Sequence, residues 1–383
     1  MQQHRRGGPI IATILVLAVI VSLGVVRAAT QLGTTVTRHT TATLTQATSL
    51  VPTATPQGLL PGLQVQGTQF VDATGKTVRL IGATRQSLEY LCRGDGHLNP
   101  ADFAAMRSWG MNVVRLPLSS EFWANAGGDC PDYRTTVTQT IYNAESAGLY
   151  VIADLQWNAP FDTAYDRTHG GVQCPLPDNG KDLAFWHDLA TIYAHDGAVL
   201  FDLFGEPHDI SWTSWQHGTT ITAGCYIVNP SGEPQEQVSY TGVGMRDLMA
   251  QVRTIAPNNI IILSGLNWGY DLGGISSTAN ESNVVYGTHP FDHSDKQPAD
   301  WSRAFGNVAQ GHAVIATEFG SYDCKTEYIR QAIAYFNAHN MSWLAWAWDA
   351  GDCHGPSLLA DWSGTPSQPY GAFVQAAMLK AQQ

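Results

Sequence analysis

Two glutamates stand out because each lies within two residues of the end of a short apolar run typical of a buried strand. Glu206 follows the run at residues 199–204, and Glu318 follows the run at residues 313–317. If both strands belong to one barrel, the two carboxylates can face each other across a single pocket. One protonated and one ionised carboxyl flanking a bond is the arrangement that glycoside hydrolysis requires. Alternatively, either glutamate could serve only to stabilise the N-terminus of the helix that follows it.

The elements that must position these glutamates repeat one pattern: a short apolar run, a loop and an amphipathic stretch. Strands are expected at residues 79–83, 112–117, 149–155, 199–204, 260–264, 283–288, 313–317 and 342–348. Helices are expected at residues 100–109, 134–147, 181–194, 237–255, 326–339 and 370–380. Near-continuous apolar strands are buried on both faces and therefore parallel. The pattern predicts an α/β fold, the (β/α)8 TIM barrel. The competing doubly wound sheet would need a Gly-rich turn after the first strand, which residues 81–85 do not provide.

The whole chain divides into three parts. Residues 1–29 have a basic start and an apolar run, which predicts either a signal peptide or an N-terminal membrane anchor. Residues 30–58, rich in Thr, Ala, Ser and Pro, are expected to form a disordered linker. Residues 59–383 would form the barrel domain, opening with a β-hairpin at residues 63–80. We therefore expect a secreted protein, or one tethered to the outer face of the cell membrane.

Composition excludes several classes of protein. Lys and Arg number 20 against 32 Asp and Glu, a net charge of −12, which argues against nucleic-acid binding. The 12 Trp, 14 Tyr and 12 Phe exclude disorder for most of the chain. The sequence contains no HExxH, CxxC, GxSxG or phosphate-loop motif. We therefore expect no metal and no cofactor, and we expect a monomer.

The predicted order of strands around the barrel suggests how the cysteines pair. All six lie in loops after expected strands, and six cysteines allow 15 pairings. Pairing between neighbouring loops would give the disulfides Cys92–Cys130, Cys174–Cys225 and Cys324–Cys353. Reduced, buried thiols are the alternative, which the export signal disfavours.

Aromatic and imidazole side chains gather near the same strand ends. The tryptophans there are Trp157, Trp212, Trp215, Trp268, Trp346 and Trp348. Indole rings can stack on the apolar faces of sugars, although some of these tryptophans are expected to be core residues. His208 and His293 should border the pocket and titrate near neutrality, and we do not assign them as metal ligands.

These motifs resemble glycoside hydrolase family 5, the cellulase-type retaining glycosidases with a (β/α)8 fold. The resemblance runs from about residue 63 to the C-terminus and includes NVVRLPL, YVIADLQWN, LFDLFGEPHD, VVYGTHPF, IATEFGS and WLAWAWDAGD. It implies that Glu206 is the acid/base and Glu318 the nucleophile. It further implies that Arg115 steadies the nucleophile's carboxylate, that His289 lines the sugar site and that Trp346 is a stacking platform.

Three positions depart from the family pattern. Gly205 stands where the family usually has Asn, Gln156 where it has His, and Phe291 where it has Tyr. The resemblance implies an endo-β-1,4-glucanase that cleaves a β-linked polysaccharide or oligosaccharide by double displacement. The departures at Gly205 and Phe291 leave a catalytically impaired carbohydrate-binding protein as the alternative. A barrel enzyme that uses the acids as metal ligands is a third reading.

Overall fold

Eight parallel strands close into a barrel. The structure, a computed structural model, describes residues 58–160, 164–226, 234–275 and 281–381. The barrel strands, in order around the barrel, are β4 (Ile81–Thr84), β5 (Val113–Ser119), β6 (Tyr150–Trp157), β7 (Val199–Asp202), β10 (Ile261–Ser264), β11 (Val284–Thr288), β12 (Val314–Ala316) and β13 (Ser342–Ala345). Pairing of β13 with β4, for example Leu344 beside Gly82, closes the ring. The predicted (β/α)8 barrel is confirmed.

The inside of the barrel changes from apolar to polar along the strands. At its N-terminal end, Val113, Ile152 and Leu200 pack together with residues from the other strands in one buried cluster. Side chains on a strand alternate between its two faces, so the residue two positions further on returns to the interior. Two positions further along these three strands stand Arg115, Asp154 and Asp202, all fully buried. Strand geometry therefore places charged groups directly beneath the barrel mouth.

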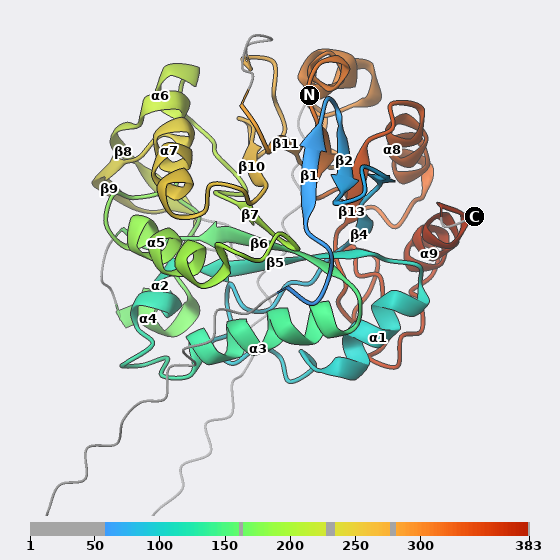
Figure 1. Cartoon of the computed structure of the whole chain (residues 1–383), viewed down its shortest axis with the longest axis horizontal. Helices are drawn as coiled ribbons and strands as arrows, with labels where there is room; N and C mark the ends of the chain where they lie inside the picture. The colour runs from blue at the N-terminus through green and yellow to red at the C-terminus, as the bar shows by residue number, and fades with distance from the viewer. Residues whose placement is uncertain (1–57, 161–163, 227–233, 276–280, 382–383) are drawn as a thin grey trace, which may run out of the picture. The chain divides into compact units, whose positions relative to one another are not determined.

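A small sheet closes the apolar end of the barrel. It consists of β1 (Leu63–Gln66), β2 (Gln69–Asp72) and β3 (Thr77–Val78), paired antiparallel in that order. Leu63 and Phe70 from this sheet join the apolar cluster at the barrel's N-terminal end. The predicted hairpin is confirmed and gains a third short strand (Figure 1).

Helices surround the strands, as Figure 1 shows. They are α1 (Pro100–Ser108), α2 (Ser120–Ala124), α3 (Tyr133–Ser146), α4 (Ala164–His169), α5 (Lys181–Tyr193), α6 (Trp212–His217), α7 (Met245–Ile255), α8 (Glu327–Ala338) and α9 (Tyr370–Ala381). Between β11 and β12 stand the short helical turns Pro298–Asp300, Ser302–Gly306 and Val308–Gln310. Asn99 shows why α1 begins where it does, because its side chain accepts from the amides of Ala101 and Asp102.

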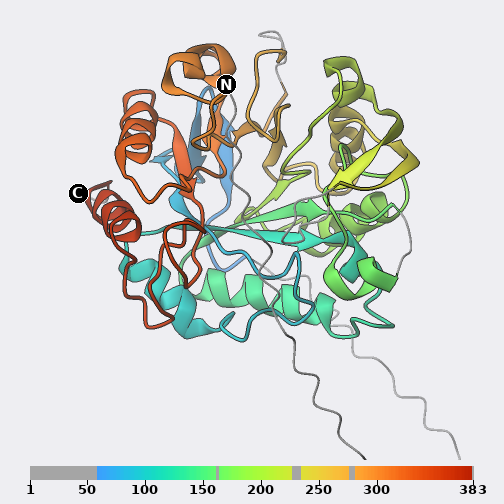
Figure 2. The ribbon, with the colours of Figure 1, turned by 180° about the vertical axis from the view of Figure 1, so that it is seen from behind.

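The helix expected at residues 237–255 is wrong in its first part. Residues Pro234–Gly242 form β9, which pairs antiparallel with β8 (Thr219–Tyr226), and α7 begins only at Met245. Gly242 and Gly244 favour a break before the helix. The Tyr240 hydroxyl donates to the Leu176 carbonyl at 2.7 Å, which ties β9 to the loop after β6. Figure 2 shows this hairpin in yellow beside α7.

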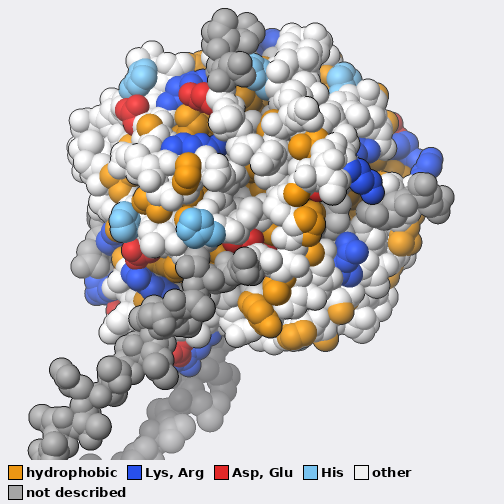
Figure 3. Space-filling view, in the orientation of Figure 1, with side chains coloured by type: hydrophobic (Ala, Val, Ile, Leu, Met, Phe, Trp, Pro, Cys, Tyr) orange, Lys and Arg blue, Asp and Glu red, His pale blue; other side chains and the backbone are white. Residues whose placement is uncertain are grey.

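The segments before the domain, residues 1–29 and 30–57, lie outside the described residues, so the signal or anchor and the linker stay predictions. Within the described residues, no helix has the length and apolar character needed to cross a bilayer. On the face drawn in Figure 3, charged side chains are sparse between uncharged atoms, in keeping with the charged content of 14%.

Candidate active site

A pocket of about 560 Å³ opens where the barrel strands end. It is lined by Gln86, Glu89, Tyr90, Gln156, Trp157, Gln173, Glu206, Asn267, Trp268, Phe291, His293, Asp295, Lys296, Glu318, Tyr322 and Trp346. These residues come from the last two positions of β6 and from loops after seven of the eight barrel strands. The mouth of a (β/α)8 barrel at the strands' C-terminal ends is where such folds carry their sites.

Glu206 and Glu318 meet in this pocket. Glu206 stands four residues after β7 and Glu318 two residues after β12, and a carboxylate oxygen of each lies within 4.8 Å of the other. The Glu318 side chain is 4% exposed and that of Glu206 is 16% exposed. The two carboxyls expected to act together are therefore brought together, with Glu206 the more open to solvent.

His289, directly after β11, lies between the two acids. Its Nδ1 is 3.1 Å from Glu206 Oε1 and 3.8 Å from Glu318 Oε2, and its Nε2 is 2.9 Å from the Thr317 hydroxyl. Nδ1–H can donate to Glu206, while Nε2 contacts the Thr317 hydroxyl either as the acceptor of a neutral ring or as the donor of a protonated one. His289 is fully buried and borders the pocket through the acids rather than lining it.

Arg115 supports the pair from below. Its guanidinium donates to Glu318 and lies 2.9 Å from Asp154 and 3.3 Å from Asp202. One cation faces three carboxyls, so the cluster is left with excess negative charge, which a bound proton reduces. Burial, together with the charges of Asp202, Glu318 and Glu206, raises the pKa of Asp154 well above its usual range, against the opposing effect of Arg115. The shift favours a proton on Asp154, while the contact with Arg115 favours an ionised Glu318.

Glu206 receives three hydrogen bonds. Oε2 accepts from Gln156 Nε2 at 3.0 Å and from Gln173 Nε2 at 2.6 Å, while Oε1 faces His289. Burial would raise the pKa of Glu206, but the hydrogen bond and charge of His289, with Lys296 and Arg115, lower it to about 2. In the empty site Glu206 is thus held as a carboxylate.

Burial raises the pKa of Glu318, the charge of Glu206 adds to this, and His289 and Arg115 oppose it. Two acids this close titrate as a pair, and the pair binds a proton more readily than either acid alone. The direct contact of Arg115 favours the negative charge on Glu318. If the pair binds a proton, Glu206 is therefore the favoured site, provided that the hydrogen bonds donated to its carboxylate are lost.

Gly205 makes room for this hydrogen-bond network. A Cβ at position 205 would clash with Gln156 Oε1 and would lie 2.5 Å from Arg115 Nη2 and 3.0 Å from Asp154 Oδ1. The amide of Gln156 occupies that space and links Arg115 to Glu206, accepting from Arg115 Nη2 at 2.9 Å. Two departures from the family pattern, Gly205 and Gln156, are therefore structurally coupled.

Some of the residues expected to bind substrate line the pocket, and others support those that do. Trp157, Phe291 and Trp346 line the pocket, and Phe291 stacks against Tyr322 with ring centroids 5.6 Å apart. His208 does not line it. Its ring lies parallel to Trp268 at 3.6 Å, and its Nδ1 contacts the Glu206 carbonyl at 2.8 Å. His208 therefore backs Trp268, and Trp268 forms the wall.

The other expected aromatic residues divide in the same way. Trp215 and Trp348 are buried in the core, while Trp212 packs against that core. His293 lines the pocket, as expected.

Several pocket residues escaped the sequence reasoning. Gln173, Glu89 and Lys296 all line the pocket from loops. Burial raises the pKa of Glu89 to about 8, whereas burial lowers the pKa of Lys296. None of them follows a strand directly, so strand-end position gave no signal for them. In the sequence, only the neighbouring Cys174 indicates that the loop carrying Gln173 is held in place.

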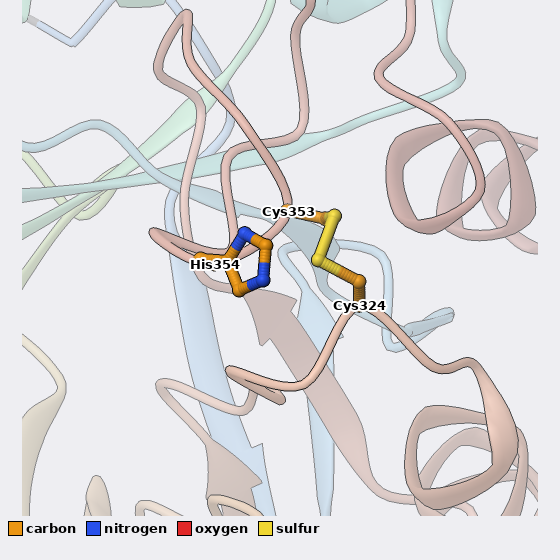
Figure 4. Close-up of side chains that lie close together, drawn as sticks. All are labelled: Cys324, Cys353 and His354. Carbon is orange, nitrogen blue, oxygen red and sulfur yellow. A yellow bond between two sulfur atoms is a disulfide. The ribbon is translucent and has the colours of Figure 1, made fainter.

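Three disulfides hold the loops around the mouth, with the pairing expected from neighbouring loops. They are Cys92–Cys130, Cys174–Cys225 and Cys324–Cys353. Figure 4 shows His354 beside the third bridge. These two cysteines and His354 would have the donor types of a metal site, but both sulfurs are bonded to each other.

Glu206, His289 and Glu318 also have donor types suited to a divalent ion. Their mutual contacts, together with the Arg115 contact, already give each of the three side chains a partner. Their arrangement is therefore explained without invoking a metal.

Comparison with known proteins gives a consistent result. The family model described as cellulase, glycosyl hydrolase family 5, matches residues 71–352. An endoglucanase of Clostridium saccharobutylicum is 22% identical over 338 residues, covering 82% of this chain and 64% of that protein. An endoglucanase of Thermobifida fusca is 23% identical over 353 residues, covering 85% of this chain and 65% of that protein. The chain thus spans just under two thirds of the length of these two curated relatives.

Solved structures share the fold. A β-glucanase of Saccharophagus degradans in complex with cellotetraose matches with a TM-score of 0.63 at 21% identity, over 84% of this chain and 94% of that one. The catalytic domain of an endoglucanase of Thermobifida fusca matches with a TM-score of 0.61 at 20% identity, over 83% of this chain and 97% of that one. At these identities the likeness establishes the barrel.

Proposed function

This chain belongs to glycosyl hydrolase family 5, and from that membership we propose that it is a retaining endo-β-1,4-glucanase. Glu206 serves as acid/base and Glu318 as nucleophile in this proposal. The relatives named above are endoglucanases, and one structural neighbour was solved with cellotetraose. These names support a β-1,4-linked glucan as the substrate.

The observation that carries the proposal is the short distance between the two acids. A carboxylate oxygen of Glu206 and one of Glu318 lie within 4.8 Å. Retaining glycosidases have their carboxyls about 5–5.5 Å apart, whereas inverting ones need about 6.5–9.5 Å to admit a water. An oxygen pair within 4.8 Å fits the retaining spacing better than the inverting one and so supports direct attack by one carboxylate on the sugar.

In the first step an oxygen of Glu318 attacks the anomeric carbon. The bond from that carbon to the glycosidic oxygen breaks, and Glu206 transfers its proton to the departing oxygen. Arg115 keeps Glu318 ionised and oriented until attack. The product is a glycosyl ester on Glu318 and a shortened glucan with a free hydroxyl.

In the second step a water attacks the same carbon. Glu206, now a carboxylate, accepts the proton of the water, and the ester bond to Glu318 breaks. Esterification removes the negative charge of Glu318, which lowers the proton affinity of Glu206 and suits it to act as a base. The sugar leaves with the configuration it had in the polymer, and both acids return to their starting states.

The surroundings of the acids suit a glycan substrate, and they leave Glu206 with a side-chain donor despite the departure at Gly205. Trp157, Trp268 and Trp346 give the pocket aromatic walls, which suit the apolar faces of pyranose rings. The amide of Gln156 contacts Glu206 although position 205 carries no side chain. A non-catalytic carbohydrate-binding protein is therefore not favoured.

The proposal places the enzyme outside the cell, secreted or held at the outer face of the membrane by residues 1–29. The three disulfides support an oxidising compartment. Measuring the protein in the culture medium and in the membrane fraction distinguishes secretion from tethering.

The decisive experiment measures bond cleavage and its stereochemistry. Carboxymethyl-cellulose, glucomannan and xyloglucan are incubated with the protein, and released reducing ends are counted. Proton NMR of the first products from a cello-oligosaccharide then reports the anomer. Cleavage with the β-anomer formed first is expected. The α-anomer first, or no cleavage of any glucan, would refute the assignment.

A further inference from the structure

We propose that Gln173 is a positioning residue of this site, whose side-chain amide holds Glu206 in the empty pocket and is displaced by the glycosidic oxygen. The proposal rests on the function proposed above. It assigns a role to a residue in the loop after β6, away from the barrel strands.

The contacts of Glu206 show that a donor must move. Both of its oxygens face donors, Oε2 from Gln156 and Gln173 and Oε1 from His289. A general acid must present a protonated oxygen to the leaving group within hydrogen-bond reach. An oxygen that carries the proton has less capacity to accept, so Oε2 cannot donate to the leaving group and keep both amide hydrogen bonds. One of the amides therefore gives way when substrate binds.

The surroundings single out Gln173 as the donor that leaves. Gln156 is held at its other end by Arg115 at 2.9 Å, and His289 is held by Thr317 at 2.9 Å. The side-chain partner of Gln173 among the described residues is Glu206 itself. Gln173 also lines the pocket and is partly exposed, so an incoming sugar can reach its amide.

The backbone on both sides of Gln173 is fixed. Val172 exchanges two backbone hydrogen bonds with Asn158, at 2.9 and 2.8 Å. The Cys174 amide donates to the Asn158 side chain at 3.1 Å, and Cys174 is bonded to Cys225. Val172 and Cys174 are both buried. A rotation of the Gln173 side chain is thus enough to move its amide, and the loop need not open.

Displacement of the Gln173 amide would raise the proton affinity of Glu206 when substrate binds. Hydrogen bonds donated to a carboxylate favour its ionised form, so losing the shorter bond, at 2.6 Å, makes Glu206 easier to protonate. The cations facing Glu206 are Arg115, His289 when protonated, and Lys296. The negative charge of Glu206 in turn acts to raise the pKa of five neighbouring groups. These are Asp154, Asp202, Glu318, Tyr322 and His208. The proposal moves the Gln173 side chain alone, so it leaves the contacts of these groups unchanged.

The test compares two pH profiles in the full chain. The alkaline limb of kcat/KM reports the acid of the free enzyme, and that of kcat reports the acid of the substrate complex. In the wild type the kcat/KM limb should lie at lower pH than the kcat limb. Gln173→Ala should move the kcat/KM limb upward by about one pH unit, the effect of one hydrogen bond to a charged group. Its kcat limb should stay in place.

Controls separate this role from a structural one. Gln331→Ala, on the exposed face of α8, should shift neither limb, and Gln173→Met keeps the side-chain volume without the amide. Unchanged limbs in both Gln173 variants would overturn the proposal, as would a fall in kcat with no shift. Equal upward movement of both limbs would also overturn it, because the amide would then stay on Glu206 in the complex.

A second readout does not depend on activity. Carbon-13 NMR of the Glu206 carboxyl, assigned by comparison with Glu206→Gln, gives its titration in the ligand-free protein. Gln173→Ala should raise the midpoint, and adding cellotetraose to the wild type should raise it similarly. An unmoved midpoint in the variant refutes the role of Gln173. A protein that cuts no glucan would refute the proposed function and leave this titration interpretable.

Discussion

The side-chain amide of Gln156 occupies the space that a side chain in place of Gly205 would need. A Cβ there would clash with Gln156 Oε1 and would lie 2.5 Å from Arg115 Nη2. The Gln156 amide uses this space to link the arginine that holds Glu318 to the carboxyl of Glu206. The two residues act as one unit, so changing either one alone should disturb both catalytic acids.

Gly205→Asn should therefore lower kcat/KM even though it introduces the residue usual in the family. The new side chain must push Gln156 away from Glu206 and crowd Arg115, and loss of one oriented donor costs about 10²–10³-fold. Adding Gln156→Ala frees the space, so the double variant should be more active than the product of the two single effects predicts. Strictly multiplicative effects in steady-state kinetics would contradict the coupling.

The roles of the two acids can be separated with substrates of different leaving groups. Glu206→Gln should lower activity on cello-oligosaccharides by about 10²–10⁴-fold, because the leaving oxygen then receives no proton. An aryl glycoside with an acidic phenol leaves without that proton, so its ester-forming step should be nearly normal. Glu318→Gln should lower activity on both substrates, on the order of 10⁴-fold or more, since it removes the nucleophile.

Burst kinetics with the aryl glycoside provides the measurement. Glu206→Gln should release one equivalent of phenol quickly and then turn over slowly, because the second step lacks its base. Glu318→Gln should show no burst. The reverse pattern would exchange the two assignments.

A second pair of acids makes stability depend on pH. Glu145 in α3 and Asp196 before β7 share a hydrogen bond between their carboxyls. Burial and the charge of Asp196 raise the pKa of Glu145 to about 8. The folded state keeps this proton between about pH 4.5 and 8 while the unfolded chain loses it. Stability contributed by this proton is therefore full below pH 4.5 and is lost as the pH rises to 8, by up to about 1.4 kcal/mol per pH unit.

Glu145→Gln should flatten this dependence, because an amide donates to Asp196 without titrating. Urea midpoints at pH 5 and pH 8 measure the effect, and the wild type should lose more than the variant between them. Glu327→Gln, at an exposed position on α8, serves as the matched control and should behave like the wild type. If the urea midpoint of Glu145→Gln falls as much between pH 5 and pH 8 as that of the wild type, the Glu145–Asp196 pair is not the source of the pH dependence.

The sequence predicts the barrel well because its strands are nearly uninterrupted apolar runs. Glu206 and Glu318 could be found for the same reason, since each follows such a run and the topology brings strand ends together. The sequence wrongly predicts part of β9 as helix, because the residues of the β8–β9 hairpin are largely polar and lie outside the repeated apolar runs of the barrel strands. Gln173 and Lys296 could not be found, because loop paths depend on disulfides and backbone hydrogen bonds that have no periodicity.

The disulfides allow the anchoring of Gln173 to be tested without touching the pocket. Cys174→Ser/Cys225→Ser opens a bridge across 51 residues, and Cys92→Ser/Cys130→Ser opens one across 38. Chain entropy predicts a similar loss for both, about 4 kcal/mol of unfolding free energy. The first pair borders Gln173, so only its removal should move the alkaline limb of kcat/KM upward, as is expected for Gln173→Ala. Equal shifts in both variants, or no shift in either, would show that the Cys174–Cys225 bridge stabilises the fold without holding the amide on Glu206.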